Sequence, residues 1–440
     1  MRTLLAVLLS ASALVHSSAM AAPTFADDLD VVKREYLARS LAFSEQDRQR
    51  ALAYIESIKN RSASMPRPEQ MAALLRIGAF AHNGHDWLNN GGGWLPDLHL
   101  PVRILWLADG MTVAQAAPGY ERLLGGEILT IAGKSPDELL ATLRQYNGGT
   151  DDFIKTRGIW LVESPQLLKA MGVTSRADRV QVQVRRADGV VETCELKAVT
   201  SKRSAHDENS LGAWSRVVSA KQRQLGWKPA GGSAEPFYLQ EPARTFRMHE
   251  LPQLDALYVQ FRSNLDGPNE SIAAFAQAVH DKLAATTMHH VILDQRFNTG
   301  GNSDITMDLM REIGQRIKGR VYVLIGPRTF SAGIVSTALV KHASNNRAIL
   351  VGEETGDRLR WWSEGHRVCL PSSKYCMAYT TGLWDLAKGC AGETGCYGDR
   401  FDAAVPHLSP DLPAPVTRAA WLAGKDPAMD AVARDLAQNQ

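Results

Sequence analysis

The clearest pattern along the chain is an alternation of short apolar runs with longer amphipathic segments in its C-terminal half. The apolar runs predict buried strands at 254–261, 289–296, 320–326 and 347–352. The segments between them carry apolar residues at helical spacing and predict helices at 269–284, 304–317 and 331–343. Strands that alternate with helices predict an α/β domain, which we assign to residues 246–440.

The part of the chain before this domain predicts a different organisation. Residues 22–98 are mostly helical in pattern, with Ser44 as a candidate N-cap and Pro68 in the first turn of a second helix. Residues 99–200 predict a small β-rich module, in which Asp109-Gly110 joins two strands and Ser135 opens a helix. Residues 201–245 are polar and interrupted by Gly and Pro, which predicts a linker or surface excursion.

The first residues have the three zones of a secretory signal peptide. A positive start is followed by an apolar stretch from Leu4 to Val15 and by small residues up to Ala21, after which we expect cleavage. The apolar stretch is shorter than the ~20 residues that span a bilayer. We therefore expect an exported protein, periplasmic or extracellular, without stable membrane insertion. The net charge of +2 gives no broad electrostatic case for binding nucleic acid.

The chain contains five cysteines, and cysteines of an exported protein can form disulfides. Cys369 and Cys376 flank a Pro-Ser-Ser turn, and Cys390 and Cys396 flank a similar short segment, so we expect these two pairs. Four clustered cysteines allow three connectivities, and the alternatives stay open. Zinc is a rival, although the spacings do not match the usual knuckle pattern. Cys194 is left unpaired, and we expect it to be a buried apolar residue.

Two strand ends carry candidate chemistry. The strand that ends at Asp294 continues to Gly300-Gly301, where backbone N–H groups can point into a cleft as an oxyanion hole requires, although a plain turn is the simpler interpretation. The next strand leads to Ser331 at the start of a helix. A serine at that position is commonly a helix cap, but it is also where a nucleophile can stand.

These motifs resemble, in order, those of the tail-specific or C-terminal processing serine peptidases and the related tricorn core peptidase. The matching positions are Leu293, Asp294, Arg296, Asn298, Gly300 and Gly301, then Ser331-Ala332, then Gly352, Glu353, Thr355 and Gly356. The resemblance implies a crotonase/ClpP-like α/β catalytic domain and a PDZ-like module at 99–200. It also implies that Ser331 is the nucleophile and that the N–H groups of Gly301 and Ala332 form the oxyanion hole.

The base departs from the commonest pattern of this family. C-terminal processing proteases use a lysine soon after the threonine landmark, and "TGDRLRWW" contains none. Arginine cannot replace it, because its pKa stays above ~12. The tricorn-like branch instead supplies a histidine from the region before the PDZ-like module, and His85 stands at that place. Imidazole suits a general base at neutral pH.

Other residues near the expected site have less definite assignments. The acid that orients His85 is assigned to Asp402, with Asp399 and Glu393 as competitors, whereas Asp86 is expected to be a solvated neighbour. His82 and His85 could share a metal, but no third ligand is identifiable, and we expect neither a metal nor a cofactor.

The sequence thus predicts an exported serine-type peptidase that acts on polypeptides. One alternative is a binding or scaffold protein that keeps the fold without the reaction, since a fold alone does not establish an activity. Another is an acyl hydrolase or esterase that uses the same residues.

Overall fold

The structure is a computed structural model that describes residues 22–200, 211–232, 235–390, 392 and 393, 395–397 and 403–439. The expected signal peptide, Asp399 and Asp402 lie outside the described residues. Within the described ranges, no helix combines the length and the apolar character that a membrane span requires.

The C-terminal half forms an α/β domain around a six-stranded sheet with the order β10-β11-β12-β13-β14-β17. β10 is antiparallel to β11, and the other neighbours are parallel. The strands are β10 (Phe246–Leu251), β11 (Ala256–Phe261), β12 (His290–Asp294), β13 (Val321–Ile325), β14 (Ile349–Gly352) and β17 (Leu412–Pro413). The helices are α9 (Ile272–Ala285), α10 (Met307–Arg316), α11 (Ala332–Ala343), α13 (Arg418–Leu422) and α14 (Pro427–Gln438).

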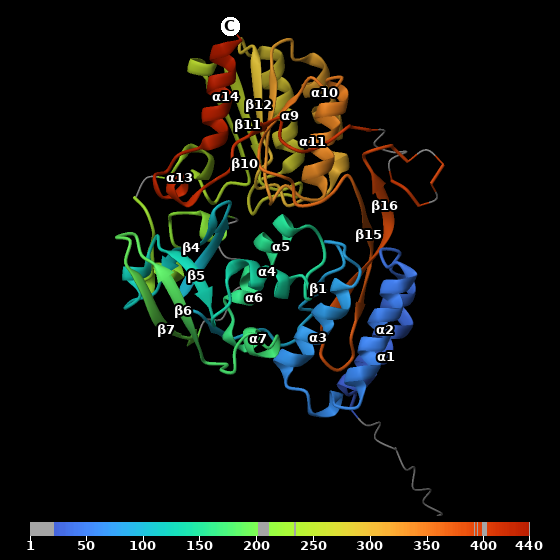
Figure 1. Ribbon diagram of the computed structural model, residues 1–440. Coiled ribbons are helices and arrows are strands. Elements are labelled where there is room, and N and C mark those ends of the chain that lie inside the picture. The colour runs from blue at the N-terminus through green and yellow to red at the C-terminus, as the bar shows by residue number, and fades with distance from the viewer. Residues whose placement is uncertain are drawn as a thin grey trace, which may run out of the picture.

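Both faces of this sheet are covered, which explains its unbroken apolar strands. In β11, Leu257 and Val259 pack with α9, α10 and α11 on one face, whereas Tyr258 packs with α14 on the other (Figure 1). Side chains of a strand point alternately to its two faces, so each strand contributes to two cores. The predicted strands and helices of this domain are confirmed.

The β-rich module is an antiparallel sheet with the order β3-β4-β5-β6-β7. Its strands are β3 (Val102–Leu107), β4 (Gly110–Ala116), β5 (Glu127–Ile131), β6 (Arg179–Arg185) and β7 (Val191–Lys197). Two short strands, β2 (Leu98–His99) and β8 (Val199–Thr200), pair beside it. The expected strand pair around Asp109-Gly110 is confirmed, and the PDZ likeness stays a prediction.

Helices cover this module, and some of them were not predicted. α4 (Pro136–Leu143) begins after Ser135, whose hydroxyl accepts from the Glu138 N–H as expected. The pattern did not indicate α5 (Asp151–Arg157), α6 (Ile159–Val162) and α7 (Pro165–Ala170), which are short. The segment that follows contributes the helical turns η4 (Gly212–Trp214) and η5 (Phe237–Leu239) and the helix α8 (Ala220–Gln224). It also contributes β9 (Lys228–Pro229), which pairs with β4.

The N-terminal region is helical, as predicted. It consists of α1 (Phe25–Val31), the π-helical segment η1 (Val32–Leu37), α2 (Glu45–Lys59), the turn η2 (Ser62–Ser64) and α3 (Arg67–Ala79). Ser44 caps α2 by accepting from the Asp47 N–H, and Pro68 lies in the first turn of α3. The short strand β1 (Leu88–Asn89) follows.

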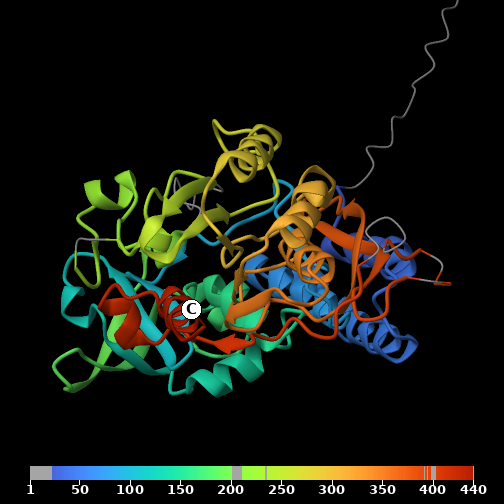
Figure 2. The same ribbon diagram turned by 90° about the horizontal axis from the view of Figure 1, so that it is seen from above.

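A long hairpin connects this region with the α/β domain. It is made of β15 (Arg360–Cys369) and β16 (Cys376–Asp385), and β16 pairs with β1. Figures 1 and 2 show the hairpin running from the α/β domain alongside the N-terminal helices. At its tip, the Asp28 carboxylate of α1 accepts the backbone N–H groups of Ser372 and Ser373, each at 2.7 Å. Residues from opposite ends of the chain thereby meet.

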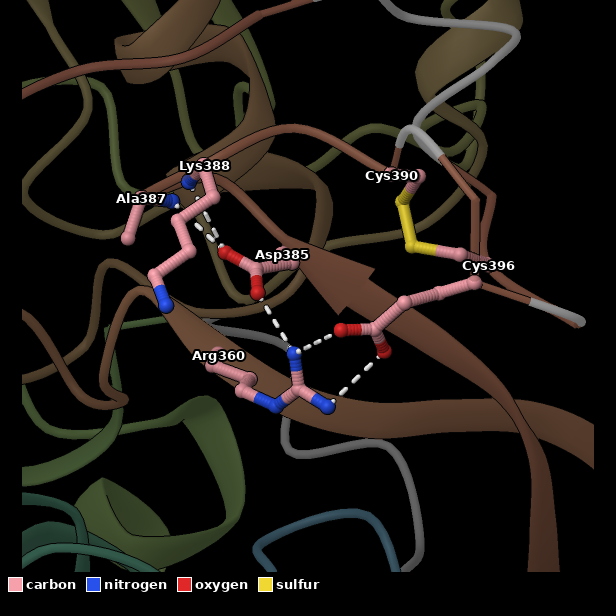
Figure 3. Close-up of a disulfide and its surroundings, with 7 residues drawn as sticks. Arg360, Asp385, Ala387, Lys388, Cys390 and Cys396 are labelled. Atoms are coloured by element: carbon pink, nitrogen blue, oxygen red, sulfur yellow. Dashed lines mark hydrogen bonds and ion pairs between the residues drawn. A yellow bond between two sulfur atoms is a disulfide. The ribbon is translucent and has the colours of Figure 1, made fainter.

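Both expected disulfides are present, Cys369 with Cys376 and Cys390 with Cys396. The first closes the hairpin turn across a strand pair. Figure 3 shows the second beside Arg360, which donates to Asp385 and Glu393. Cys194 forms no disulfide, as expected, but it is only partly buried, and it packs against a core that the N-terminal helices share with the β-rich module.

Candidate active site

Three neighbouring strands of the α/β sheet deliver the candidate residues to one edge. β12, β13 and β14 are parallel, so their C-terminal ends lie side by side. The segment after β12 carries Gly300-Gly301, the segment after β13 carries Ser331, and the segment after β14 carries Asp357. Ligand sites of open α/β sheets form at this edge.

Ser331 occupies the N-cap position of α11 through its backbone, but its hydroxyl makes no capping hydrogen bond. The interpretation of the side chain as a helix cap is therefore wrong. Its backbone has φ 54° and ψ −123°, a conformation that side chains with a Cβ rarely adopt. Such strain costs about 1–3 kcal/mol. The sharp strand-to-helix turn exposes the hydroxyl in the way that a nucleophile elbow does.

The glycine pair lies directly against this turn. Gly300 has φ 103°, and a Cβ at this position would lie 2.7 Å from Ser331 Cβ, so only glycine fits. Asn298 holds the two segments together: its side-chain oxygen accepts the Gly300 N–H at 3.0 Å, and its backbone carbonyl accepts the Phe330 N–H at 3.0 Å. The approach of Gly300 to Ser331 is thus fixed by hydrogen bonds to the side chain and the backbone of Asn298.

Two backbone N–H groups beside Ser331 have no acceptor in the part of the chain that the structure describes. Within the described residues, neither the Gly301 N–H nor the Ala332 N–H donates to another group of the protein. Ala332 opens α11, where the first N–H groups of a helix lack intrahelical partners. Free donors of this kind can bind an oxygen that becomes negative during a reaction.

Ser331 faces a cavity of about 590 Å³ that is also lined by Gly301 and His85. The hairpin also lines this cavity, with the β15 segment from Ser363 to Arg367 and the β16 residue Tyr379. The structure therefore brings three of the predicted site residues to one cavity, although their segments are far apart in the sequence.

His85 is enclosed by aromatic rings, with 8% of its surface exposed. Its ring stacks on Phe330 with 4.4 Å between centroids and on Trp87 with 5.9 Å. Neither ring nitrogen has a hydrogen-bond partner among the described residues, so no hydrogen bond joins His85 to Ser331. Burial, and then the cationic Arg157, lower the pKa of His85 to about 3. The imidazole is neutral at pH 7 and can accept a proton.

An acid that sequence reasoning missed lies beside His85. Asp357 Oδ2 is 4.0 Å from His85 Nδ1, and this oxygen has no hydrogen-bond partner in the described part of the chain. The other oxygen accepts the Arg358 N–H at 2.9 Å. Burial raises the pKa of Asp357 to about 6. The sequence signal for this acid is Asp357 in "TGDRLRWW", the segment in which the related proteases carry their lysine.

Comparison with known proteins gives the fold. No family model matches the sequence, and no curated protein matches it either. Among solved structures, mature CPAF complexed with lactacystin is 13% identical, with 94% of this chain and 97% of that chain covered and a TM-score of 0.60. A crystal structure of mature CPAF is 13% identical, with 95% and 98% covered and a TM-score of 0.58.

This chain has the fold of mature CPAF. The predicted α/β fold class is thereby confirmed. The photosystem II D1 C-terminal processing protease is a more distant match, at 15% identity, with 94% of this chain and 96% of that chain covered and a TM-score of 0.38.

On this CPAF-like fold, Asp86 and His82, two sequence neighbours of His85, differ in their burial. The expectation that Asp86 is solvated is wrong, because its carboxylate is buried and accepts from Tyr36, Ser40, Asn83 and Thr380. It anchors the His85 loop to the N-terminal helices and to β16. His82 is exposed and lies 3.7 Å from Asp47.

The structure also bears on two other assignments, Glu393 as an orienting acid and a metal held by histidines. Glu393, a competitor for the orienting acid, pairs with Arg360 at 2.9 Å. Across the described ranges, no group of three or more His, Cys, Asp or Glu side chains is arranged to hold a metal ion.

Proposed function

We propose that this chain is a serine-type peptidase in which Ser331 attacks the carbonyl carbon of a peptide bond. The observation that carries this function is the strained turn at Ser331, whose hydroxyl faces a cavity beside two free backbone N–H groups. A helix that needed only a cap would not require this backbone conformation, since caps normally have extended φ and ψ.

His85 acts as the base in the proposed reaction. A ring nitrogen of the neutral imidazole takes the Ser331 Oγ proton as the C–O bond forms, and it later gives this proton to the leaving amine. The tetrahedral oxyanion accepts from the Gly301 and Ala332 N–H groups. The Asp357 carboxylate accepts from His85 Nδ1–H and stabilises the imidazolium. Because no hydrogen bond joins His85 to Ser331 or to another described residue, the ring must move to reach the Ser331 hydroxyl in this reaction.

The substrate is proposed to bind as an extended strand along β15. This strand is at the edge of the β1-β16-β15 sheet, and its segment from Ser363 to Arg367 lines the cavity. An edge strand offers free backbone donors and acceptors, which recognise a main chain with weak dependence on its sequence.

The proposed location of the protein is outside the cytoplasm. The two disulfides support it, because such bonds persist in oxidising compartments. The signal-peptide pattern of residues 1–21 points the same way.

One observation favours a second candidate, a binding protein without catalysis. His85 and Ser331 share a cavity but are not hydrogen-bonded, and burial together with Arg157 makes His85 a weak base in the unliganded protein. A protein with this geometry but no reaction would still bind polypeptides along β15.

A covalent probe distinguishes the two candidates. We expect a fluorophosphonate to label the wild-type protein at Ser331, Ser331→Ala to lose all labelling, and His85→Ala to label far more slowly. Ser57→Ala is the control, because Ser57 is an exposed serine of α2 that does not line this cavity, and it should label like the wild type. Lactacystin, which is bound in a CPAF structure, serves as a second probe. A folded wild-type protein that neither probe labels would refute the peptidase.

Hydrolysis assays then separate a peptidase from an esterase. We expect release of new amino termini from denatured casein and from quenched peptides. Turnover of p-nitrophenyl esters without any peptide cleavage would assign the same residues to an acyl hydrolase.

A further inference from the structure

Among the described residues, a cationic side chain beside the proposed reaction site has no anionic partner. Arg157, the last residue of α5, is exposed to the cavity that contains Ser331 and His85. It also lines two adjoining cavities of about 360 and 330 Å³. Among the described residues, no carboxylate lies within ion-pair distance of its guanidinium group and no hydrogen bond engages it.

The nearby acids on the same module are engaged with other cations. On α5 itself, Asp151 pairs with Arg144 at 2.6 Å and Asp152 pairs with Lys155 at 3.2 Å. Glu163, which lines the 330 Å³ cavity, lies 3.4 Å from Arg103. The local acids thus have partners of their own, and Arg157 is left to face the cavity.

Aromatic rings hold this guanidinium in place. Its carbon lies 5.5 Å from the centre of the Trp87 ring and 5.7 Å from that of Phe153. Cation–π contacts orient an arginine without neutralising its charge. Protein atoms crowd the group closely enough to lower the pKa of Arg157 by desolvation. A charge that is oriented, partly desolvated and unpaired is suited to bind a carboxylate with two parallel hydrogen bonds.

The lining of the adjoining 330 Å³ cavity adds to the positive electrostatic potential around Arg157. Its charged lining residues are Glu163, Arg103, Lys155, Arg157 and Arg328. Glu163 offsets Arg103 and Asp152 offsets Lys155, whereas the charge of Arg157 is not offset by a described carboxylate, so this lining is net positive. A cleft with low-dielectric walls focuses such a potential. Thr299 and Phe330 line both this cavity and the one that contains Ser331. The positive cavity therefore opens next to the reaction site.

We propose that Arg157 is the carboxylate-binding residue of a substrate subsite beside Ser331, so that the protein prefers polypeptides with Asp or Glu next to the scissile bond. This subsite rests on the proposed peptidase function and names its substrate class. A bound carboxylate would also offset the Arg157 charge that acts on His85, and the imidazole would become a stronger base only when an acidic substrate is present. The chemistry recognised is a carboxylate, whether from a side chain or from a chain terminus.

Matched peptides test the subsite. Cleavage positions are first mapped on denatured casein, and quenched peptides spanning them are made with Glu or Gln at each of the three residues on either side of the bond. We expect kcat/KM to be about 10-fold higher for Glu than for Gln at one of these positions, as one charge-assisted hydrogen bond supports. Arg157→Gln should reduce this ratio to about 2-fold or less.

Arg144→Gln is the matched control, because it removes a cation from the same module at a residue that lines none of the three cavities. It should keep the 10-fold ratio. Peptides with a free or an amidated C-terminus separate the two sources of the carboxylate. A rate that depends on amidation and not on Glu assigns the subsite to a chain terminus and overturns the side-chain preference.

The failure of the subsite and the failure of the peptidase function give different results. Cleavage with equal rates for Glu and Gln peptides, at a Ser331 that fluorophosphonate labels, overturns the subsite alone. No cleavage and no labelling overturn the peptidase.

A binding assay that needs no turnover then decides the subsite. In the Ser331→Ala background, fluorescence anisotropy should show about 10-fold tighter binding of the Glu peptide than of the Gln peptide, and Arg157→Gln should abolish the difference. Equal binding overturns the subsite.

Discussion

Two buried clusters of polar side chains near the same sheet edge differ in how far their hydrogen bonds are satisfied. In the first, Arg296 donates to Asp294 through two nitrogens, at 3.0 and 2.7 Å, and to Asp426 at 2.7 and 3.0 Å. Tyr258 also donates to Asp294, at 2.7 Å. In the second, His85 and Asp357 lie 4.0 Å apart with three polar atoms unpartnered within the described residues.

The difference assigns the clusters to different tasks. The saturated cluster connects the end of β12 with the N-cap residue of α14, so it holds the scaffold behind the site. Unsatisfied buried polar groups cost stability, and proteins concentrate them where function requires them. His85 borders the cavity, and its ring nitrogens would gain hydrogen-bond partners there when a substrate binds and the Ser331 proton is transferred.

The largest expected effect concerns the nucleophile. Ser331→Ala should lower kcat by roughly 10⁵- to 10⁶-fold, as loss of a serine nucleophile does in other peptidases. The overall fold should be retained, since alanine keeps the Cβ that the turn already accommodates. Peptide hydrolysis and circular dichroism would be measured together. A loss below about tenfold would show that Ser331 is not the nucleophile.

Breaking the saturated cluster should mainly reduce stability. Arg296→Met leaves the buried Asp294 without its cation, and loss of one member of a buried ion pair costs about 3–5 kcal/mol. The free energy of unfolding would be measured by urea titration. Arg316→Met is the control, because Arg316 is half-exposed and its ion-pair partner among the described residues is Glu312 on the same helix. It should cost about 0.5 kcal/mol or less. Equal losses in the two variants would contradict the scaffold role.

Asp357 should affect the rate and not substrate binding. Asp357→Asn removes the charge that stabilises the His85 imidazolium, and we expect kcat to fall roughly 10- to 100-fold, within the range of general-base catalysis, with KM nearly unchanged. Glu393→Gln tests the exposed competitor and should leave kcat as it is. A normal kcat in Asp357→Asn would show that Asp357 does not stabilise the His85 imidazolium during the reaction.

The smallest effect is on the pH dependence of stability. His85 has a pKa of 6.5 when unperturbed and about 3 in the folded protein. Between these values the unfolded chain binds more protons, so His85 makes stability rise with pH. The pKa of Asp357 goes from 3.8 to about 6 on folding, so Asp357 makes stability fall as pH rises between these values.

Variants should separate these opposing contributions. Relative to the wild type, His85→Gln should gain thermal stability at pH 4 compared with pH 7, and Asp357→Asn should gain it at pH 7 compared with pH 4. His82→Gln, an exposed histidine three residues from His85, should move this balance little. The measurement is the melting temperature of the wild type and of each variant from pH 4 to pH 8. Changes of the same sign in the first two variants would contradict the assignment.

Local signals in the sequence predicted local structure. Ser44 and Ser135 each cap the helix that follows, Asp109-Gly110 joins two paired strands, and Cys369 pairs with Cys376 across one hairpin. In each case the partners lie within a few residues, so geometry follows from spacing alone. The α/β fold followed from the same kind of pattern summed over several elements.

Long-range partners could not be obtained in this way. The neighbourhood of Asp357 depends on how the N-terminal loop of His85 packs against the end of β14, and no spacing encodes that contact. The burial of Asp86 depends likewise on Ser40 and Thr380, which are contributed by distant segments. His85 itself was found by resemblance and not by periodicity.

The backbone of Ser331 has a consequence for how this protein can evolve. Its positive φ suits glycine, so Ser331→Gly should raise thermal stability, by about 1 kcal/mol, while removing the oxygen that the proposed reaction needs. Selection for stability alone would favour that replacement. With serine at this position, the protein is therefore less stable than the same fold with glycine would be. In return, the strained turn places the serine hydroxyl at the cavity in which the proposed reaction takes place.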